Sequence, residues 1–158
     1  MKNITGAGII IYYDNRNGFI KELKDDVVFL VLEDNNGNYD FPKGGIEKKE
    51  EPIRCAVRET REECSLKKDL HYYLHENKFI VSGGGLVMYL ANFLPKNYNS
   101  FLKEPKVIPN PYSNFMEHKE EHMWLTSQEI NKSGKLLHYL TKYLDCLLYT
   151  SPSPRDCQ

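Results

Sequence analysis

Residues 44 to 66 read GGIEKKEEPIRCAVRETREECSL, and the fold of the chain can be predicted outward from this segment. Gly44 and Gly45 predict a loop, because glycine lets the backbone approach a ligand without a Cβ in the way. The pattern changes at Pro52, since proline suits a first helical position, where its missing N–H is not needed. We therefore predict a helix over Pro52–Cys64.

One side of this predicted helix should be buried. Its small and apolar residues recur at spacings of three and four, which is the period of one helical face: Ile53, Ala56, Val57, Thr60 and Cys64. This stripe is expected to pack against a sheet, with the acidic residues on a different face.

Those acidic residues, Glu59, Glu62 and Glu63, lie at positions i, i+3 and i+4, so one helical turn brings their side chains onto one surface. Three carboxylates so close repel one another unless a cation lies among them. Ligands that are all oxygen suit Mg²⁺ or Mn²⁺ rather than zinc. Alone, such a run is more often a solvated helix face, but the preceding loop with Lys43 favours a site for phosphate and metal.

The rest of the chain predicts a sheet around this helix. Apolar, β-branched segments predict strands at residues 6–13, 27–33, 78–81, 86–94 and 122–125. A turn at residues 35–38 is expected to close a hairpin. Strands before, between and after two helices predict one mixed α/β domain.

The last third contains a loop and a second helix. Residues 96–115 are rich in proline and asparagine and predict a long loop. Thr126 to Glu129 form a capping-box pattern, which marks a helix start. The helical stripe that follows consists of Leu136, Leu137, Leu140 and Leu144.

Composition narrows the class of protein. With 158 residues the chain fits one domain. A net charge of −1 gives no overall field for nucleic acid or a membrane surface, and no apolar run is long enough to span a bilayer. The four cysteines form no CxxC pair. We expect a cytoplasmic protein.

The spacing within residues 44–66 resembles a known signature. Gly44 is followed by five residues, Glu50, seven residues and then the run Arg58 to Leu66, RETREECSL, as in the Nudix box of Nudix hydrolases. Two positions depart from it: Ser65 replaces the usual glycine, which bears on how the helix ends, and Thr60 replaces an aliphatic residue.

The resemblance implies a fold and a set of roles. The fold would be the Nudix α/β fold, a mixed β-sheet sandwiched between helices, and the activity would be Mg²⁺- or Mn²⁺-dependent cleavage of a phosphoanhydride bond. The expected site residues take three roles: Glu59, Glu62 and Glu63 bind metal or act as the base that activates water, Arg58 orients a carboxylate, and the loop of Lys43, Gly44 and Gly45 contacts the phosphorylated ligand, with the Gly44 carbonyl joining the metal shell.

A further glutamate from the loop before the last core strand often completes catalysis in the family. Glu117, Glu120 and Glu121 are the candidates here. We rank Glu121 first because it lies three residues before Trp124.

The substrate implied is a small phosphorylated molecule. The segment FPKGGIE at residues 41–47 resembles dinucleoside polyphosphate hydrolases, which act on compounds such as diadenosine tetraphosphate, and the related diphosphoinositol polyphosphate hydrolases. Nucleic acid enters only as capped or 5′-phosphorylated RNA, and no membrane partner is expected. The alternative from another class is a non-catalytic nucleotide-binding domain. The pattern does not distinguish a monomer from a dimer.

Residues 146–158 are set apart from the expected Nudix domain at residues 1–145. The segment CLLYTSPSPRD resembles the translation of a sequencing-library adapter. We therefore expect an adapter-derived or disordered tail and leave it out of the fold.

Overall fold

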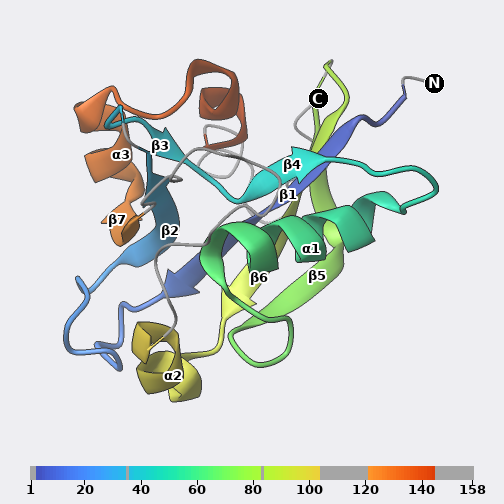
Figure 1. Cartoon of the computed structure of the whole chain (residues 1–158). Helices are drawn as coiled ribbons and strands as arrows, with labels where there is room; N and C mark the ends of the chain where they lie inside the picture. Colours follow the sequence, from blue (N-terminus) through green and yellow to red (C-terminus); the bar gives the residue numbers. More distant parts are fainter. Residues whose placement is uncertain (1–2, 35, 83, 104–120, 145–158) are drawn as a thin grey trace.

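The computed structural model describes residues 3–34, 36–82, 84–103 and 121–144. A mixed sheet lies between helix α1 (Pro52–Cys64) and helix α3 (Ser127–Ser133), as Figure 1 shows. Two separate clusters of buried side chains, one on each face of the sheet, fill these layers. The predicted fold class, α/β with a mixed sheet sandwiched between helices, is confirmed.

Seven strands make the sheet: β1 (Gly6–Asp14), β2 (Val27–Glu33), β3 (Tyr39–Asp40), β4 (Lys43–Gly45), β5 (Tyr72–Val81), β6 (Leu86–Phe93) and β7 (Glu121–Thr126). Their order is β3-β2-β1-β6-β5, with β4 added to β1 and β7 added to β2. The β1–β6 pair is parallel and the other pairs are antiparallel.

Strand β1 is the centre of the sheet because its sequence is apolar on both sides. Ile9 and Ile11 enter the cluster beneath α1, while Ile10 enters the cluster beneath α3. A strand buried on both faces is expected to be such an apolar run. Along β1, strand β4 pairs with Gly6–Gly8 and β2 pairs with Tyr12–Asp14, so β2 and β4 use different parts of the same strand.

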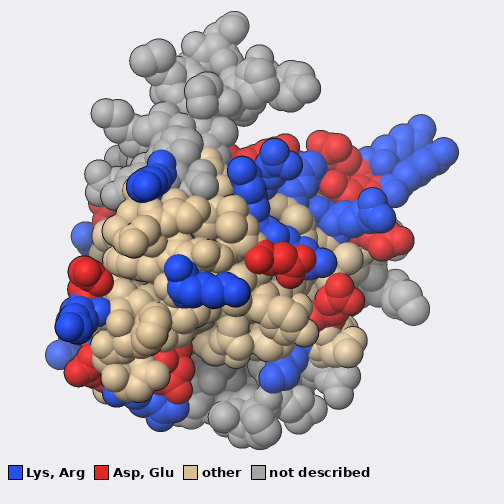
Figure 2. Space-filling model, turned by 90° about the horizontal axis from the view of Figure 1, so that it is seen from below, with Lys and Arg blue, Asp and Glu red and all other residues tan. Residues whose placement is uncertain are grey.

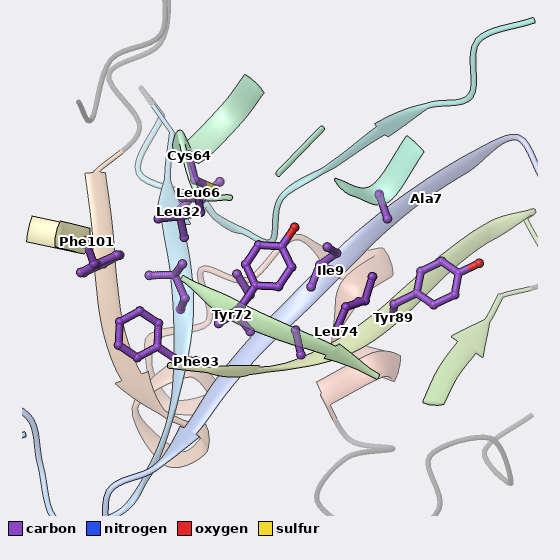
Figure 3. Close-up of a cluster of buried hydrophobic side chains, with 14 of the residues drawn as sticks. Ala7, Ile9, Leu32, Cys64, Leu66, Tyr72, Leu74, Tyr89, Phe93 and Phe101 are labelled. Carbon is purple, nitrogen blue, oxygen red and sulfur yellow. The ribbon is translucent and has the colours of Figure 1, made fainter. Parts of the chain in front are cut away.

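The core beneath α1 is rich in aromatic rings. Cys64 and Leu66 from the end of α1 lie beside Tyr72, Phe93 and Phe101, which come from β5, β6 and the short helix α2 (Tyr98–Lys103) (Figure 3). All five side chains are buried. The short 3₁₀ helix η1 (Pro95–Asn97) leads into α2. These contacts fix the end of α1 on the sheet.

Four predicted elements differ from the structure. Gly44 and Gly45, predicted with Lys43 as a loop, form the short strand β4, because their backbone pairs with Gly6–Gly8 of β1; we keep the name loop for the segment from Lys43 to the start of α1. Strand β5 begins at Tyr72, not at residue 78, because a bulge between His75 and Phe79 interrupts the alternation that reveals a strand. Part of the predicted loop, residues 96–103, belongs to η1 and α2; residues 104–115 lie outside the described part. No described helix is long and apolar enough to cross a membrane.

The second predicted helix is shorter than its leucine stripe suggested. The capping box is confirmed, since the Thr126 side chain accepts from the Glu129 N–H and the Glu129 carboxylate accepts from the Thr126 N–H. Helix α3 ends at Ser133 because Gly134 takes a left-handed conformation, φ 64°. Leu136, Leu140 and Leu144 are buried, but they lie beyond α3, around the 3₁₀ helix η2 (His138–Leu140).

The end of α1 carries a measurable strain. Ser65 adopts the left-handed conformation, φ 61°, and its N–H donates to the Arg61 carbonyl as in a glycine-capped helix. A side chain in this conformation costs about 1–2 kcal/mol relative to glycine. The serine therefore accepts the glycine geometry instead of changing how the helix ends.

We expect Ser65→Gly to raise the free energy of unfolding by about 1 kcal/mol, measured by urea denaturation, since part of the relieved strain is offset by the greater entropy of glycine in the unfolded chain. Arg54→Gly is the control, because Arg54 is exposed within α1. A glycine at this helical position should lower the free energy of unfolding by about 1 kcal/mol. Equal destabilisation by both changes would contradict the strain at Ser65.

Candidate active site

The candidate site lies where strand β4 meets helix α1. Strand β4 pairs with the first residues of β1, and α1 contacts both strands. The loop and the helix are therefore held by the same sheet. This places the Gly44 backbone directly against the acidic face of α1.

Glu59 lies under the loop. A Cβ on Gly44 would overlap the Glu59 carboxylate, so only glycine leaves room for this side chain. Glu59 is mostly buried, with 15% of its side chain exposed. Burial raises its pKa, although hydrogen bonding from Arg58 acts in the opposite direction.

Arg58 gathers the surrounding groups. Its Nε and Nη2 donate to the two oxygens of Glu50 at 2.8 and 2.9 Å, which is a bidentate pair. Its Nη1 donates to Glu59 at 2.9 Å and Glu62 at 3.1 Å, and Nη2 also donates to the Gly45 carbonyl at 2.9 Å. Hydrogen bonds from Arg58 lower the pKa of Glu50 to about 2.

Glu63 points to the other end of the loop. Its Oε1 accepts a hydrogen bond from the backbone N–H of Lys43 at 2.7 Å. The Lys43 ammonium is 3.0 Å from Asp40 Oδ2 and 5.3 Å from the centre of the Tyr139 ring. Burial alone would lower the pKa of Lys43, but Asp40 and the Tyr139 oxygen outweigh it and raise that pKa.

Cys55, on α1, contacts the backbone of the loop. Its Sγ lies 3.5 Å from the Gly44 oxygen and 3.4 Å from the Gly45 oxygen, within hydrogen-bond distance for sulfur. The residue is fully buried, and burial raises the pKa of its thiol to about 11. Cys55 is therefore a neutral donor that packs the loop onto α1.

Thr60, the second departure from the signature, fits its place. It is fully buried, and its hydroxyl donates to the Ala56 carbonyl at 2.8 Å. A buried hydroxyl with a partner avoids the cost of an unsatisfied polar group. The substitution therefore leaves the buried face of α1 intact.

The three acidic residues do not converge on one point. Within residues 3–103 and 121–144, as far as these are described, no group of three or more His, Cys, Asp and Glu is placed to hold a metal ion. Arg58 lies between Glu59 and Glu62, and Glu63 turns to Lys43. This arrangement offsets the mutual repulsion of the carboxylates with a guanidinium and a backbone N–H.

The donor set nevertheless suits a hard divalent cation. Glu59, Glu62, Glu63 and the Gly44 carbonyl offer only oxygen ligands. The cradle at Gly44 holds one carboxylate close to the backbone. Glu62 is 55% exposed, so it needs only a side-chain rotation to leave Arg58.

The structure describes one of the three candidate glutamates before the last strand. Glu117 and Glu120 lie outside the described residues. Glu121 begins β7, where its backbone pairs with Glu33. The role of the three therefore stays a prediction.

Sequence reasoning missed three neighbours of the site. Asp40 lies three residues before Lys43, so the charge pair was visible in the spacing. Cys55 lies one turn before Glu59 on α1, which was also visible. Tyr139 reaches Lys43 from nearly a hundred residues away, and no local signal marks it.

The chain is similar in sequence to a family model and to two curated proteins. A family model described as "NUDIX domain" matches residues 4–140. Over 101 residues the chain is 35% identical to the mRNA-decapping enzyme subunit 2 of Saccharomyces cerevisiae strain YJM789 and to the m7GpppN-mRNA hydrolase of strain S288c. Each match covers 64% of this chain and 8% of the relative, so the chain spans less than a tenth of their length.

Solved structures share the fold at low sequence identity. An Ap4A hydrolase of C. elegans in a binary complex has a TM-score of 0.55 at 20% identity, covering 90% of this chain and 93% of that one. The Nudix hydrolase RenU of M. smegmatis has a TM-score of 0.58 at 15% identity, covering 92% and 84%. These likenesses concern the fold alone.

The Arg58–Glu50 pair predicts a pH-dependent stability. The folded pKa of Glu50, about 2, lies below its ordinary value of 4.5. Its contribution is present above pH 4.5 and is lost as the pH falls towards 2. In urea denaturation, Glu50→Gln should destabilise the protein most above pH 4.5, and the difference should shrink between pH 4.5 and 2.5.

Glu47→Gln is the control for this series, because Glu47 is 68% exposed and lies 3.6 Å from Arg58. It should show little destabilisation at any pH. A deficit of Glu50→Gln that stayed constant from pH 7 to 2.5 would mean that the pair does not control stability.

The cradle predicts a contrast between adjacent glycines. In Gly44→Ala the new methyl group displaces the Glu59 carboxylate, the movable end of a side chain, whereas in Gly45→Ala it meets open space. We expect Gly44→Ala to weaken Mg²⁺ binding about tenfold or more by calorimetry, with a much smaller effect for Gly45→Ala. Thermal melts should show both variants folded. Equal Mg²⁺ affinity in the two variants would show that the Glu59 position does not matter.

Proposed function

The chain belongs to the NUDIX domain family, and from that premise we propose that it hydrolyses a phosphoanhydride bond in a nucleoside polyphosphate with Mg²⁺ or Mn²⁺ as cofactor. The observation that carries the proposal is the close packing of Glu59 beneath the Gly44 backbone, with Arg58 joining it to Glu62. Such a cradle of oxygens beside a glycine loop suits a cation and a diphosphate together.

Each residue of the site has a part in this chemistry. Glu59, Glu62, Glu63 and the Gly44 carbonyl would hold the divalent cation, which when bound neutralises the phosphates and stabilises charge on the leaving group. A carboxylate of the cluster, for which we choose Glu63, takes a proton from the attacking water. Arg58 keeps Glu59 in place, and Glu50 keeps Arg58 in place. We assign to Glu121, the first residue of β7, the supporting acidic role.

We propose a dinucleoside polyphosphate, such as diadenosine tetraphosphate, as the substrate, because the loop at residues 41–47 resembles hydrolases of that class. A second candidate is capped RNA, favoured by the 35% identity to the yeast decapping enzyme. On the face shown in Figure 2, Lys and Arg lie among Asp and Glu around a broad area of other residues. An RNA chain gains most of its affinity from phosphate contacts with gathered basic side chains, and the net charge of −1 gives no overall field for one, which favours a small substrate. Diphosphoinositol polyphosphate is the third candidate.

A cytoplasmic location and a catalytic domain over residues 1–145 complete the proposal. The separate origin of residues 146–158 rests on their sequence alone and lies outside the described residues. Sequencing of the source DNA across codon 145 tests that boundary directly.

Glu63→Gln should lower turnover at least about 100-fold, since the amide neither holds a cation well nor takes a proton. The expected thermal unfolding midpoint stays near that of the unchanged protein. Phosphate release at saturating Mg²⁺ is the measurement, and Glu51→Gln, an exposed residue just before α1, is the control. Full activity of Glu63→Gln would remove Glu63 from the site.

A substrate panel tests the function itself. Diadenosine tetraphosphate, a diphosphoinositol polyphosphate and capped RNA are assayed side by side with Mg²⁺ and with excess chelator. We expect the highest kcat/KM for diadenosine tetraphosphate and no turnover with chelator. A chain that binds nucleotide but cleaves none of the three is the non-catalytic domain instead.

A further inference from the structure

We propose that the ring of Tyr139 forms a nucleobase subsite beside the phosphate loop. This inference rests on the proposed function, since it concerns what is attached to the diphosphate. Tyr139 belongs to η2, in the segment that follows α3. Figure 1 shows this segment, in red, beside β3 and near β4.

A short path joins the ring to the acidic cluster. Glu63 accepts from the Lys43 backbone at 2.7 Å, and the Lys43 ammonium lies 5.3 Å from the centre of the Tyr139 ring. One lysine side chain therefore separates the ring from a carboxylate proposed to act at the diphosphate. A nucleoside attached to a diphosphate at Glu63 would therefore extend along Lys43 to reach the Tyr139 ring.

The ring is open to a ligand while its backbone is held. Tyr139 is 52% exposed, although its neighbour Leu140 is fully buried. The Leu137 N–H donates to the Tyr39 carbonyl at 3.0 Å, and the Tyr39 N–H donates to the Lys135 carbonyl at 2.8 Å. These bonds attach the segment to β3. Because the backbone that carries the ring is already ordered, little backbone entropy is lost when a base stacks on the ring.

The chemistry around the ring favours an aromatic, neutral group. Asp40 neutralises Lys43, so the ammonium that lies over the ring is already paired, and the base would stack on the part of the ring that Lys43 leaves open. A half-exposed aromatic ring next to a paired charge suits a nucleobase, because any of the bases can stack on tyrosine. A polyphosphorylated inositol ring has no such face. Tyr139 would thus favour nucleoside substrates over diphosphoinositol polyphosphates.

The test compares ADP with inorganic pyrophosphate, which share a diphosphate and differ in the nucleoside. Binding is measured by isothermal titration calorimetry with saturating Mg²⁺, so it does not depend on turnover. The full chain is used unchanged and as Tyr139→Ala, Tyr139→Phe and Tyr73→Ala. Tyr73 is the matched control because it is 55% exposed and packs edge-to-face on His75, away from the loop.

We expect Tyr139→Ala to raise the Kd of ADP about fivefold or more, the effect of losing one stacked base, and to leave the Kd of pyrophosphate unchanged. Tyr139→Phe keeps the ring and should keep the ADP affinity, as should Tyr73→Ala. An unchanged ADP affinity in Tyr139→Ala overturns the subsite. So does equal weakening of ADP and pyrophosphate, because the tyrosine would then act only through Lys43.

The same set separates this inference from the proposed function. If the unchanged protein cleaves no nucleotide but Tyr139→Ala still weakens ADP selectively, the subsite stands and the hydrolase assignment fails. If diadenosine tetraphosphate is cleaved with the same KM by the unchanged protein and Tyr139→Ala, the hydrolase stands and the subsite fails.

Discussion

The guanidinium of Arg58 is the interaction on which the site depends. It bonds to Glu50, Glu59, Glu62 and the Gly45 carbonyl at once, so it fixes the loop before α1 to the acidic face of α1. A planar, permanently charged fork can make these bonds together, which the ammonium of lysine cannot do with the same geometry. Without it, three carboxylates within one turn would repel one another and the loop would lose its anchor.

The carboxylates around Arg58 differ in their burial and in their pKa, and therefore in how readily they could bind a cation. Glu50 is held as an anion and belongs to the scaffold, whereas Glu59 is buried and its pKa is raised. Glu62 is exposed, and its partner within the described part of the chain is Arg58. A cation bound beside Gly44, as proposed, would compete with Arg58 for Glu59 and Glu62 and would leave the bidentate pair with Glu50 in place. The scaffold and the ligands share one arginine but use different nitrogens of it.

The sequence predicted the fold well where one period ran through a whole element. The helix over Pro52–Cys64 and the strand over Val27–Glu33 have the predicted bounds. The prediction failed where a local irregularity broke the period: the bulge in β5 hid its first half, and Gly134 separated the buried leucines from α3. The bulge in β5 leaves no local pattern, whereas Gly134 is itself a local stop signal that the leucine stripe outweighed in the prediction.

The same limit applies to the site. Gly44, Glu50, Arg58 and the three acidic residues of α1 lie within one short segment, so their spacing reveals them. Lys43 shows what spacing leaves out. Its predicted contact with a phosphate stays a prediction, but its ammonium is paired with Asp40 and lies over the ring of Tyr139, a contact that the spacing does not reveal. The Lys43 ammonium thus joins the loop to the C-terminal segment through its contacts with Asp40 and Tyr139. Tertiary contacts that the signature does not contain would therefore decide what the proposed site recognises beyond a diphosphate.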